Sequence, residues 1–308
     1  MGVEGNTGSA DSTKRSSAPQ ARPHIAVRIG VYVFLCYVTL VVFGSLFSWF
    51  DNPIISAVGS NLVAGVFSNW LALRIFESLH IPDAGLQANR ASAENLAIGV
   101  AGGIGSAALV LGLPLLLGAA HLARVEGDEF SIGSLLFLTV LLAGGAIGEE
   151  LMVHGYGFQA LAAAVGPWAA IVPVGVLFAL LHGSNPGSTW LSTGITGGFG
   201  IVFGYAWLRS RDLWLPIGLH FGWNFTLPLF GVNISGLRIR VTGYELSWTA
   251  GKLWSGGDYG PEASVLTAAV LVLLFVYIWK APVRRQSSRI TDPPAESTVC
   301  EPSPSSLS

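Results

Sequence analysis

The sequence contains few charged residues and few cysteines. Charged residues make up 11% of the 308 residues and hydrophobic residues 51%, whereas soluble domains carry roughly 25% charged residues. The net charge of −2 provides no basic field that would attract nucleic acid. Of the two cysteines, Cys36 lies in an apolar run and Cys300 in a polar segment, so no disulfide is expected. The composition argues against a soluble domain, a nucleic-acid-binding protein and a disulfide-stabilised secreted fold.

The sequence contains several long apolar runs. A membrane-spanning helix needs about 20 mostly apolar residues, and glycine is common in membrane helices that pack closely. The chain has 39 glycines, many of them inside apolar runs. We therefore predict an all-α polytopic membrane protein with about eight transmembrane helices, at residues 27–48, 54–76, 95–120, 131–163, 167–182, 189–208, 213–230 and 263–280.

The predicted organisation is a helical domain over residues 27–280 between two disordered tails, 1–26 and 281–308. Both tails are polar and too poor in hydrophobic residues to form a core, and the first contains no apolar run typical of a cleaved signal peptide. Most Lys and Arg residues fall on one side of an eight-span arrangement, which predicts that both termini are cytoplasmic. No inverted repeat of the transporter kind is found.

Ionisable residues inside the apolar runs are the candidate functional groups, because burying them in a membrane costs several kcal/mol unless they are paired. Glu149 and Glu150 follow the run LLFLTVLLAGGAIG, and three of the six histidines share this setting: His154, His182 and His220. A single such histidine is usually a hydrogen-bonded core residue. Three of them together with a glutamate pair indicate a site.

Helical spacing restricts how these side chains can meet. Glu150 and His154 are four residues apart and share a helix face, whereas Glu149 is turned by about 100° from Glu150. Glu149 and His182 each lie about 22 Å from the cytoplasmic ends of their helices at 1.5 Å per residue, but His220 lies only about 10 Å from the start of its helix. His220 reaches the other two only if its helix is tilted or begins irregularly.

These groups are suited to hydrolysis by water. No Ser or Cys is paired with a base, so a glutamate would accept the proton of water while two imidazoles hold that water, directly or through a metal ion. A carboxylate and two histidines are also a zinc ligand set. Zn²⁺ could therefore bind at Glu149, His182 and His220. Asn224, four residues after His220, is better suited to stabilising an oxyanion. A proton relay could use the same residues.

Three motifs then resemble one known family, the glutamate-dependent intramembrane endopeptidases. This family, also called CPBP, includes the CAAX prenyl proteases and the bacteriocin-processing or Abi-type proteins. Its first motif is Glu-Glu followed by three residues and Arg-Gly, and Glu149 and Glu150 match its glutamates. Its other two motifs are Phe-x-x-x-His and His-x-x-x-Asn, matched by Phe178 with His182 and by His220 with Asn224. The flanking sequences resemble the bacterial branch.

This resemblance implies a helical fold that encloses an intramembrane active-site cavity, with a protease-like core at 131–230. It implies a catalytic role for Glu149 as the base, for His182 and His220 as water or metal partners, and for Asn224 at the oxyanion. Glu150 would have a supporting role. His154 departs from the family, which has Arg there, and an imidazole supplies a positive charge beside Glu150 only when it is protonated.

The predicted function is therefore an intramembrane endopeptidase that hydrolyses a peptide bond by Glu-activated, metal-bound or metal-free water. Its partners would be the lipid bilayer and a peptide or membrane-protein substrate, in the cytoplasmic membrane of a bacterium. The departure at His154 leaves open a catalytically silent relative that acts as an immunity or scaffold protein. A proton-coupled transporter is a third alternative, which the missing repeat disfavours. No sequence pattern indicates the oligomeric state or the identity of the substrate.

Overall fold

The computed structural model describes residues 23–292 and is almost entirely helical. Its apolar helices follow one another through short connections, with a polar N-cap at several starts, such as Asn52, whose side chain accepts from the amides of Ile54 and Ile55. The helices are α1 Ile25–Phe47, α2 Pro53–Phe76, α3 Arg90–Leu116, α4 Ile132–His154, α5 Tyr156–Val165, α6 Pro167–His182, α7 Trp190–Ser210, α8 Trp214–Leu229, α9 Lys252–Ser255 and α10 Val265–Lys280.

The helices confirm the predicted fold class. Five described segments are long and apolar enough to cross a membrane, when α4 and α5 are counted as one. The apolar helices α6 and α10 are shorter, with 16 residues each. The main difference from the sequence prediction is in the fourth stretch, predicted as one helix over 131–163, which is divided at Gly155.

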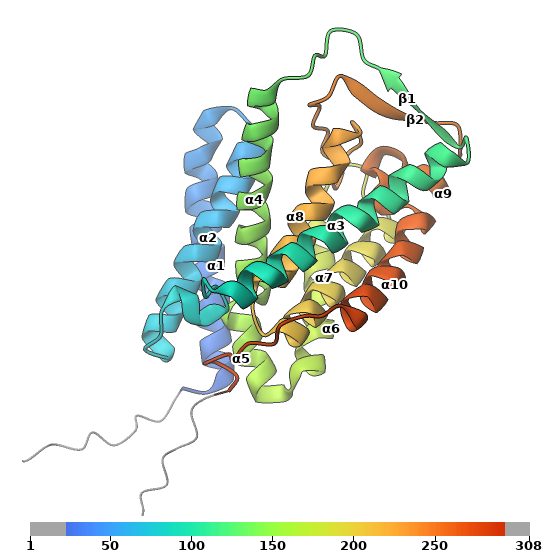
Figure 1. The fold of residues 1–308 in the computed structure, drawn as a ribbon. Helices are drawn as coiled ribbons and strands as arrows, with labels where there is room; N and C mark the ends of the chain where they lie inside the picture. The colour runs from blue at the N-terminus through green and yellow to red at the C-terminus, as the bar shows by residue number, and fades with distance from the viewer. Residues whose placement is uncertain (1–22, 293–308) are drawn as a thin grey trace, which may run out of the picture.

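The helices are arranged around the centrally placed α7 and α8 (Figure 1). The α1–α2 hairpin lies beside α4, α3 crosses α8, and α6 and α10 lie on the other side of the molecule. Buried aromatic residues of α7 and α8, such as Phe199, Phe203 and Trp223, form much of the largest hydrophobic core. Both ends of the described chain lie at the same end of the bundle, near α5 (Figure 1).

Close approach at glycines brings together the helices that carry the site. A Cβ on Gly148 of α4 would lie 2.6 Å from the backbone nitrogen of Leu62, so α2 and α4 touch backbone to backbone. On α8, a Cβ on Gly222 would lie 2.6 Å from the carbonyl oxygen of Val100 in α3. Small residues allow such crossings in membrane helices. The face of α8 opposite Gly218 and Gly222 is thereby left to point away from α3.

The break at Gly155 is held by side chains from α1 and α2. Asn69 Oδ1 accepts a hydrogen bond from the Tyr156 amide at 2.6 Å, and Asn69 Nδ2 donates to the Leu151 carbonyl at 2.8 Å. The hydroxyl of Tyr32 donates to the Met152 carbonyl, which the break deprives of its helical donor, at 3.0 Å, and to the Leu151 carbonyl at 2.8 Å. Backbone groups freed at a helix end inside a membrane need such partners. A Cβ on Gly155 would overlap Asn69 Oδ1, so glycine is required at this break.

Two features outside the helices were not predicted. Strands β1 (Ala120–Arg124) and β2 (Tyr244–Trp248) pair antiparallel, with Ala120 opposite Trp248, at the end of the bundle far from α5. Residues 281–292 also pack against the helices: the Arg284 amide donates to Asn95 Oδ1 at 2.9 Å and Ile290 is buried. These contacts differ from the disorder predicted for 281–308. The rest of that predicted tail, and residues 1–22, lie outside the described residues.

Candidate active site

The glutamate pair lies near the C-terminal end of α4, where its two side chains face different surroundings. The side chain of Glu149 is 24% exposed and lines a cavity of about 370 Å³, whereas the side chain of Glu150 is fully buried at 0%. This division agrees with the turn of about 100° between neighbouring residues of a helix. Glu149 is therefore open to a substrate or a water molecule, and Glu150 can act only through neighbouring side chains.

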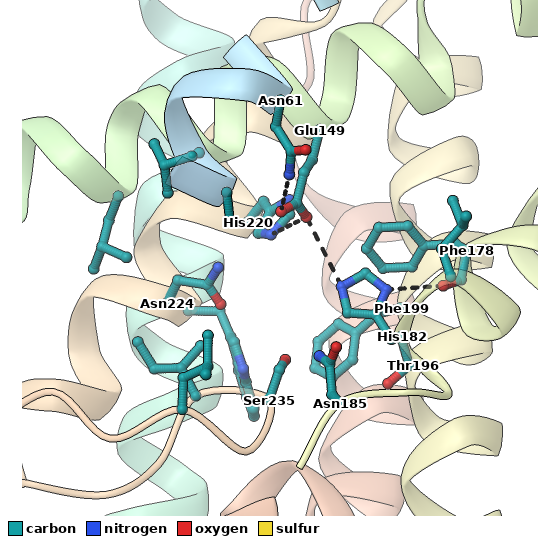
Figure 2. A pocket seen from close by; sticks show the side chains of 18 of the residues that line it. Asn61, Glu149, Phe178, His182, Asn185, Thr196, Phe199, His220, Asn224 and Ser235 are labelled. Carbon is teal, nitrogen blue, oxygen red and sulfur yellow. Dashed lines mark hydrogen bonds and ion pairs between the residues drawn. The ribbon is translucent and has the colours of Figure 1, made fainter. Parts of the chain in front are cut away.

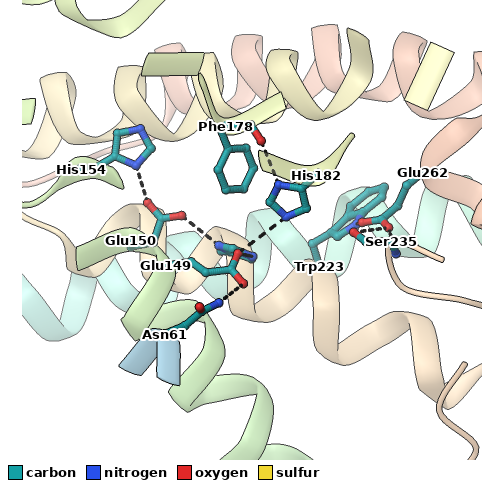
Figure 3. Close-up of polar contacts among 10 residues, drawn as sticks. Asn61, Glu149, Glu150, His154, Phe178, His182, Trp223, Ser235 and Glu262 are labelled. Atoms are coloured by element: carbon teal, nitrogen blue, oxygen red, sulfur yellow. Dashed lines mark hydrogen bonds and ion pairs between the residues drawn. The ribbon is translucent and has the colours of Figure 1, made fainter. Parts of the chain in front are cut away.

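Glu150 bridges two histidines. Its Oε1 lies 2.9 Å from Nδ1 of His220 on α8. Its Oε2 lies 2.7 Å from Nδ1 of His154, one turn further along α4, and Figure 3 shows this second contact. A carboxylate accepts hydrogen bonds, so Nδ1 of each ring is the donor. Nε2 of His154 is buried and has no hydrogen-bond partner among the described residues. His154 thus donates one imidazole N–H to Glu150, at the position where the family motif described above has Arg.

The rings of His182 and His220 present the same nitrogen to Glu149. The Nδ1 atom of His182 donates to the carbonyl of Phe178 at 2.9 Å, as Nδ1 of His220 donates to Glu150. When Nδ1 is the donor of a neutral ring, Nε2 carries the lone pair. The Nε2 atoms of His220 and His182 lie 3.6 Å and 4.0 Å from Glu149 Oε2.

These separations leave room for a water molecule that donates one hydrogen to Glu149 and the other to one of the two imidazoles. They are longer than a direct hydrogen bond, and polar groups at such distances are commonly bridged by water. The other oxygen of Glu149, Oε1, accepts from Nδ2 of Asn61 on α2 at 3.3 Å (Figure 2). Asn61 therefore holds the carboxylate so that Oε2 faces the two imidazoles.

The predicted residues come together around one cavity. Glu149, His182, His220 and Asn224 all line it, and Figure 2 shows Asn224 on the far side of the space from His182. His220, whose depth required a tilted helix or an irregular helix start, reaches the others although α8 begins only six residues earlier, at Trp214. Its helix crosses α3 at the glycine contacts described above.

The donor set can be compared with a zinc site. Histidines that ligate a metal usually donate their other ring nitrogen to a carboxylate or a backbone carbonyl, which is the arrangement of His220 and His182 here. Donors on one tetrahedral zinc ion lie about 3.3 Å apart, somewhat closer than the separations from Glu149 Oε2. Among the residues that the structure describes, no group of three His, Cys, Asp or Glu side chains is close enough to hold a metal ion. Zinc stays a prediction.

Sequence reasoning missed several polar residues of the cavity. Asn61 is one, although it was visible as a polar residue inside the second apolar stretch. Glu262 is another: it is 7% exposed and follows the long loop after α8, so its position in the sequence suggested a surface acid. Three further polar side chains line the cavity near Glu262, and they come from three different segments of the chain: Asn185, Thr196 and Ser235.

Comparison with known proteins gives one family match. No curated protein gives a significant match to the chain. Residues 131–226, about a third of the chain, match the family model described as type II CAAX prenyl endopeptidase Rce1-like. The matched segment begins just before α4 and ends within α8, so it contains Glu149, Glu150, His182, His220 and Asn224. The match confirms the resemblance of this segment to the CAAX-type membrane protease family that the motifs indicated.

Proposed function

We propose that this chain is an intramembrane endopeptidase in which Glu149 activates a water molecule for attack on a peptide carbonyl. The observation that carries the proposal is the convergence of Glu149 Oε2 with Nε2 of His182 and of His220 at the wall of one cavity. In this reaction Glu149 takes a proton from water as the new carbon–oxygen bond forms, and returns a proton to the leaving amine. Its 24% exposure gives it access to the substrate.

The histidines hold the attacking water. With both Nδ1 atoms committed as donors to Phe178 and Glu150, both Nε2 atoms are acceptors. The water donates one hydrogen to Glu149 and the other to Nε2 of one of the two histidines. Glu150 is a positioning residue, because its buried carboxylate fixes the tautomer and the orientation of His220. If zinc is bound, the same three side chains would be its ligands and it would polarise the water.

Asn224 is the candidate donor to the oxyanion. It is four residues after His220 and therefore on the same face of α8, and it lines the cavity across from His182. An amide N–H that meets the developing negative charge contributes typically 10²–10³-fold in rate. Because Asn224 has no charge of its own, its replacement should lower kcat without altering the ionisation of the site.

The test is cleavage by the full chain reconstituted in lipid vesicles, using a library of apolar peptides with and without a prenyl group and mass spectrometry of the products. Removal of a general base costs about 10²–10⁴-fold in rate. We expect a loss of that size in Glu149→Gln. The matched control is Glu126→Gln, which makes the same change at an exposed loop residue. Equal activity in the Glu149→Gln variant and its control would contradict the proposal.

A further inference from the structure

The end of the cavity formed by Asn185, Thr196, Ser235 and Glu262, here called the polar end, contains a buried carboxylate that the proposed reaction does not use. Glu262 lies in the one-turn helix Pro261–Ala263 just before α10 and is 7% exposed. Figure 3 shows it beside Ser235 and Trp223, on the side of His182 away from Glu150. Burying a carboxylate costs free energy unless hydrogen bonds or an opposite charge compensate for the lost water. A carboxylate buried at the wall of a substrate cavity is therefore a candidate for a structural or a binding role.

Three hydrogen-bond donors contact the Glu262 carboxylate, whose pKa burial nevertheless holds above its ordinary value. Its Oε1 accepts from the indole nitrogen of Trp223 at 2.9 Å, and its Oε2 accepts from the hydroxyl of Ser235 at 3.0 Å and from the Ser235 amide. All three partners are donors, which suits a carboxylate. Burial raises the pKa of Glu262, while these donors lower it. A carboxylate has about four acceptor positions, so Oε1 retains capacity for one more donor.

The charges around the cavity are of one sign. Glu149 and Glu262 both line it, and in the described part of the chain no Lys, Arg or Asp joins them there. The remaining titratable side chains of the lining are His182 and His220. Like charges brought together in a desolvated site repel strongly, and opposite charges attract. A substrate group that enters the polar end therefore meets negative charge and hydrogen-bond acceptors.

We propose that Glu262 is a specificity-determining residue that selects a cationic substrate side chain, such as lysine, at the polar end and rejects an acidic one there. The inference rests on the proposed peptidase function, because it names the class of peptide that the same cavity takes. The Glu262 carboxylate accepts a hydrogen bond from the ammonium group, while Asn185 and Thr196 provide neutral polar neighbours. The neighbouring hydroxyl of Tyr259 is buried and lies among Asn185, Thr196 and Ser235.

Binding can be measured without cleavage on the full chain carrying Glu149→Gln. The probes are blocked apolar hexapeptides in which lysine, norleucine or glutamate occupies each position in turn. We expect one position at which lysine binds about tenfold more tightly than norleucine, and at which glutamate binds more weakly than either; tenfold corresponds to about 1.4 kcal/mol. Adding Glu262→Gln should abolish this preference. The absence of any lysine preference in the Glu149→Gln chain would overturn the proposal, whatever the behaviour of further variants.

Two variants separate a binding role from a purely structural one. Ser235→Ala removes one hydrogen bond to Glu262 and leaves its charge, so it should keep the lysine preference; Glu262→Asp should keep part of it. If Ser235→Ala loses the preference as completely as Glu262→Gln, Glu262 only ties the loop to α8 and the proposal fails. A lysine preference without cleavage by the unmodified chain would contradict the peptidase function alone, whereas cleavage without the preference would contradict this inference alone.

Discussion

Gly148 offers the sharpest test of how the fold positions the candidate base. It precedes Glu149 on α4 and faces α2, where an added Cβ would lie 2.6 Å from the Leu62 nitrogen and 2.7 Å from the Leu62 Cα. Ordinary contacts begin at 3.4 Å, so Gly148→Ala must separate the two helices by roughly 0.8 Å. Overpacking of this kind costs about 1–3 kcal/mol. The separation would also stretch the 3.3 Å hydrogen bond from Asn61 to Glu149 beyond a useful length.

The matched control is Gly144→Ala, one turn earlier on the same helix, where the added Cβ would meet Leu62 Cδ2 at an ordinary 3.6 Å. Alanine there should be neutral or more stable by up to about 1 kcal/mol, since glycine is a poor helix former. Thermal unfolding in detergent and peptide cleavage should be measured on both variants. Equal stability and activity of the two would refute the claim that close approach at Gly148 sets the geometry of Glu149.

Three further predictions concern the charged and metal-binding groups. His154→Arg should leave activity within a few-fold of the parent, because His154 already donates to Glu150; activity found only in the variant would support the silent-relative alternative. Zinc bound at the site should be measured at about one ion per chain and be lost in His182→Ala, and an active protein free of metal would contradict the zinc prediction. The lysine preference should weaken as pH falls towards the raised pKa of Glu262, because an acid loses its charge below its pKa; a preference that stays constant over that range would speak against Glu262.

Much of the fold could be predicted because membrane-spanning helices are continuous apolar runs. The helices α1, α2, α6 and α10 begin and end within two residues of the predicted stretches. The break at Gly155 was missed because its cause lies elsewhere in the sequence: the partners of the freed backbone groups are Asn69 and Tyr32, on two other helices. Hydropathy averages over a window and cannot register a single glycine with remote partners.

In the candidate site, too, the residues that could be predicted lie in short sequence motifs, and the residues that were missed reach the site through contacts between distant segments. The motifs around Glu149 and His182 could be recognised because they resemble those of a known family and consist of residues close together in the sequence. Asn61 is a polar residue inside an apolar stretch, and its contact with Glu149 depends on the crossing of α2 and α4. Glu262 gave no signal, because loop acids are usually exposed and the loop folds back over the cavity through contacts with Trp223 and Ser235.

The central claim is that Glu149 activates water and does not itself attack the peptide. It is tested most directly by a single-turnover reaction in H₂¹⁸O, with the protein in excess over a peptide that it cleaves. Mass spectrometry then measures the ¹⁸O content of the new carboxyl terminus. Direct attack by water predicts one ¹⁸O atom in the first product formed, and a rate that falls by about 10²–10⁴-fold in Glu149→Gln. An unlabelled product in the first turnover would show that an oxygen of the protein attacks the carbonyl, and undiminished cleavage by Glu149→Gln would show that Glu149 is not the base.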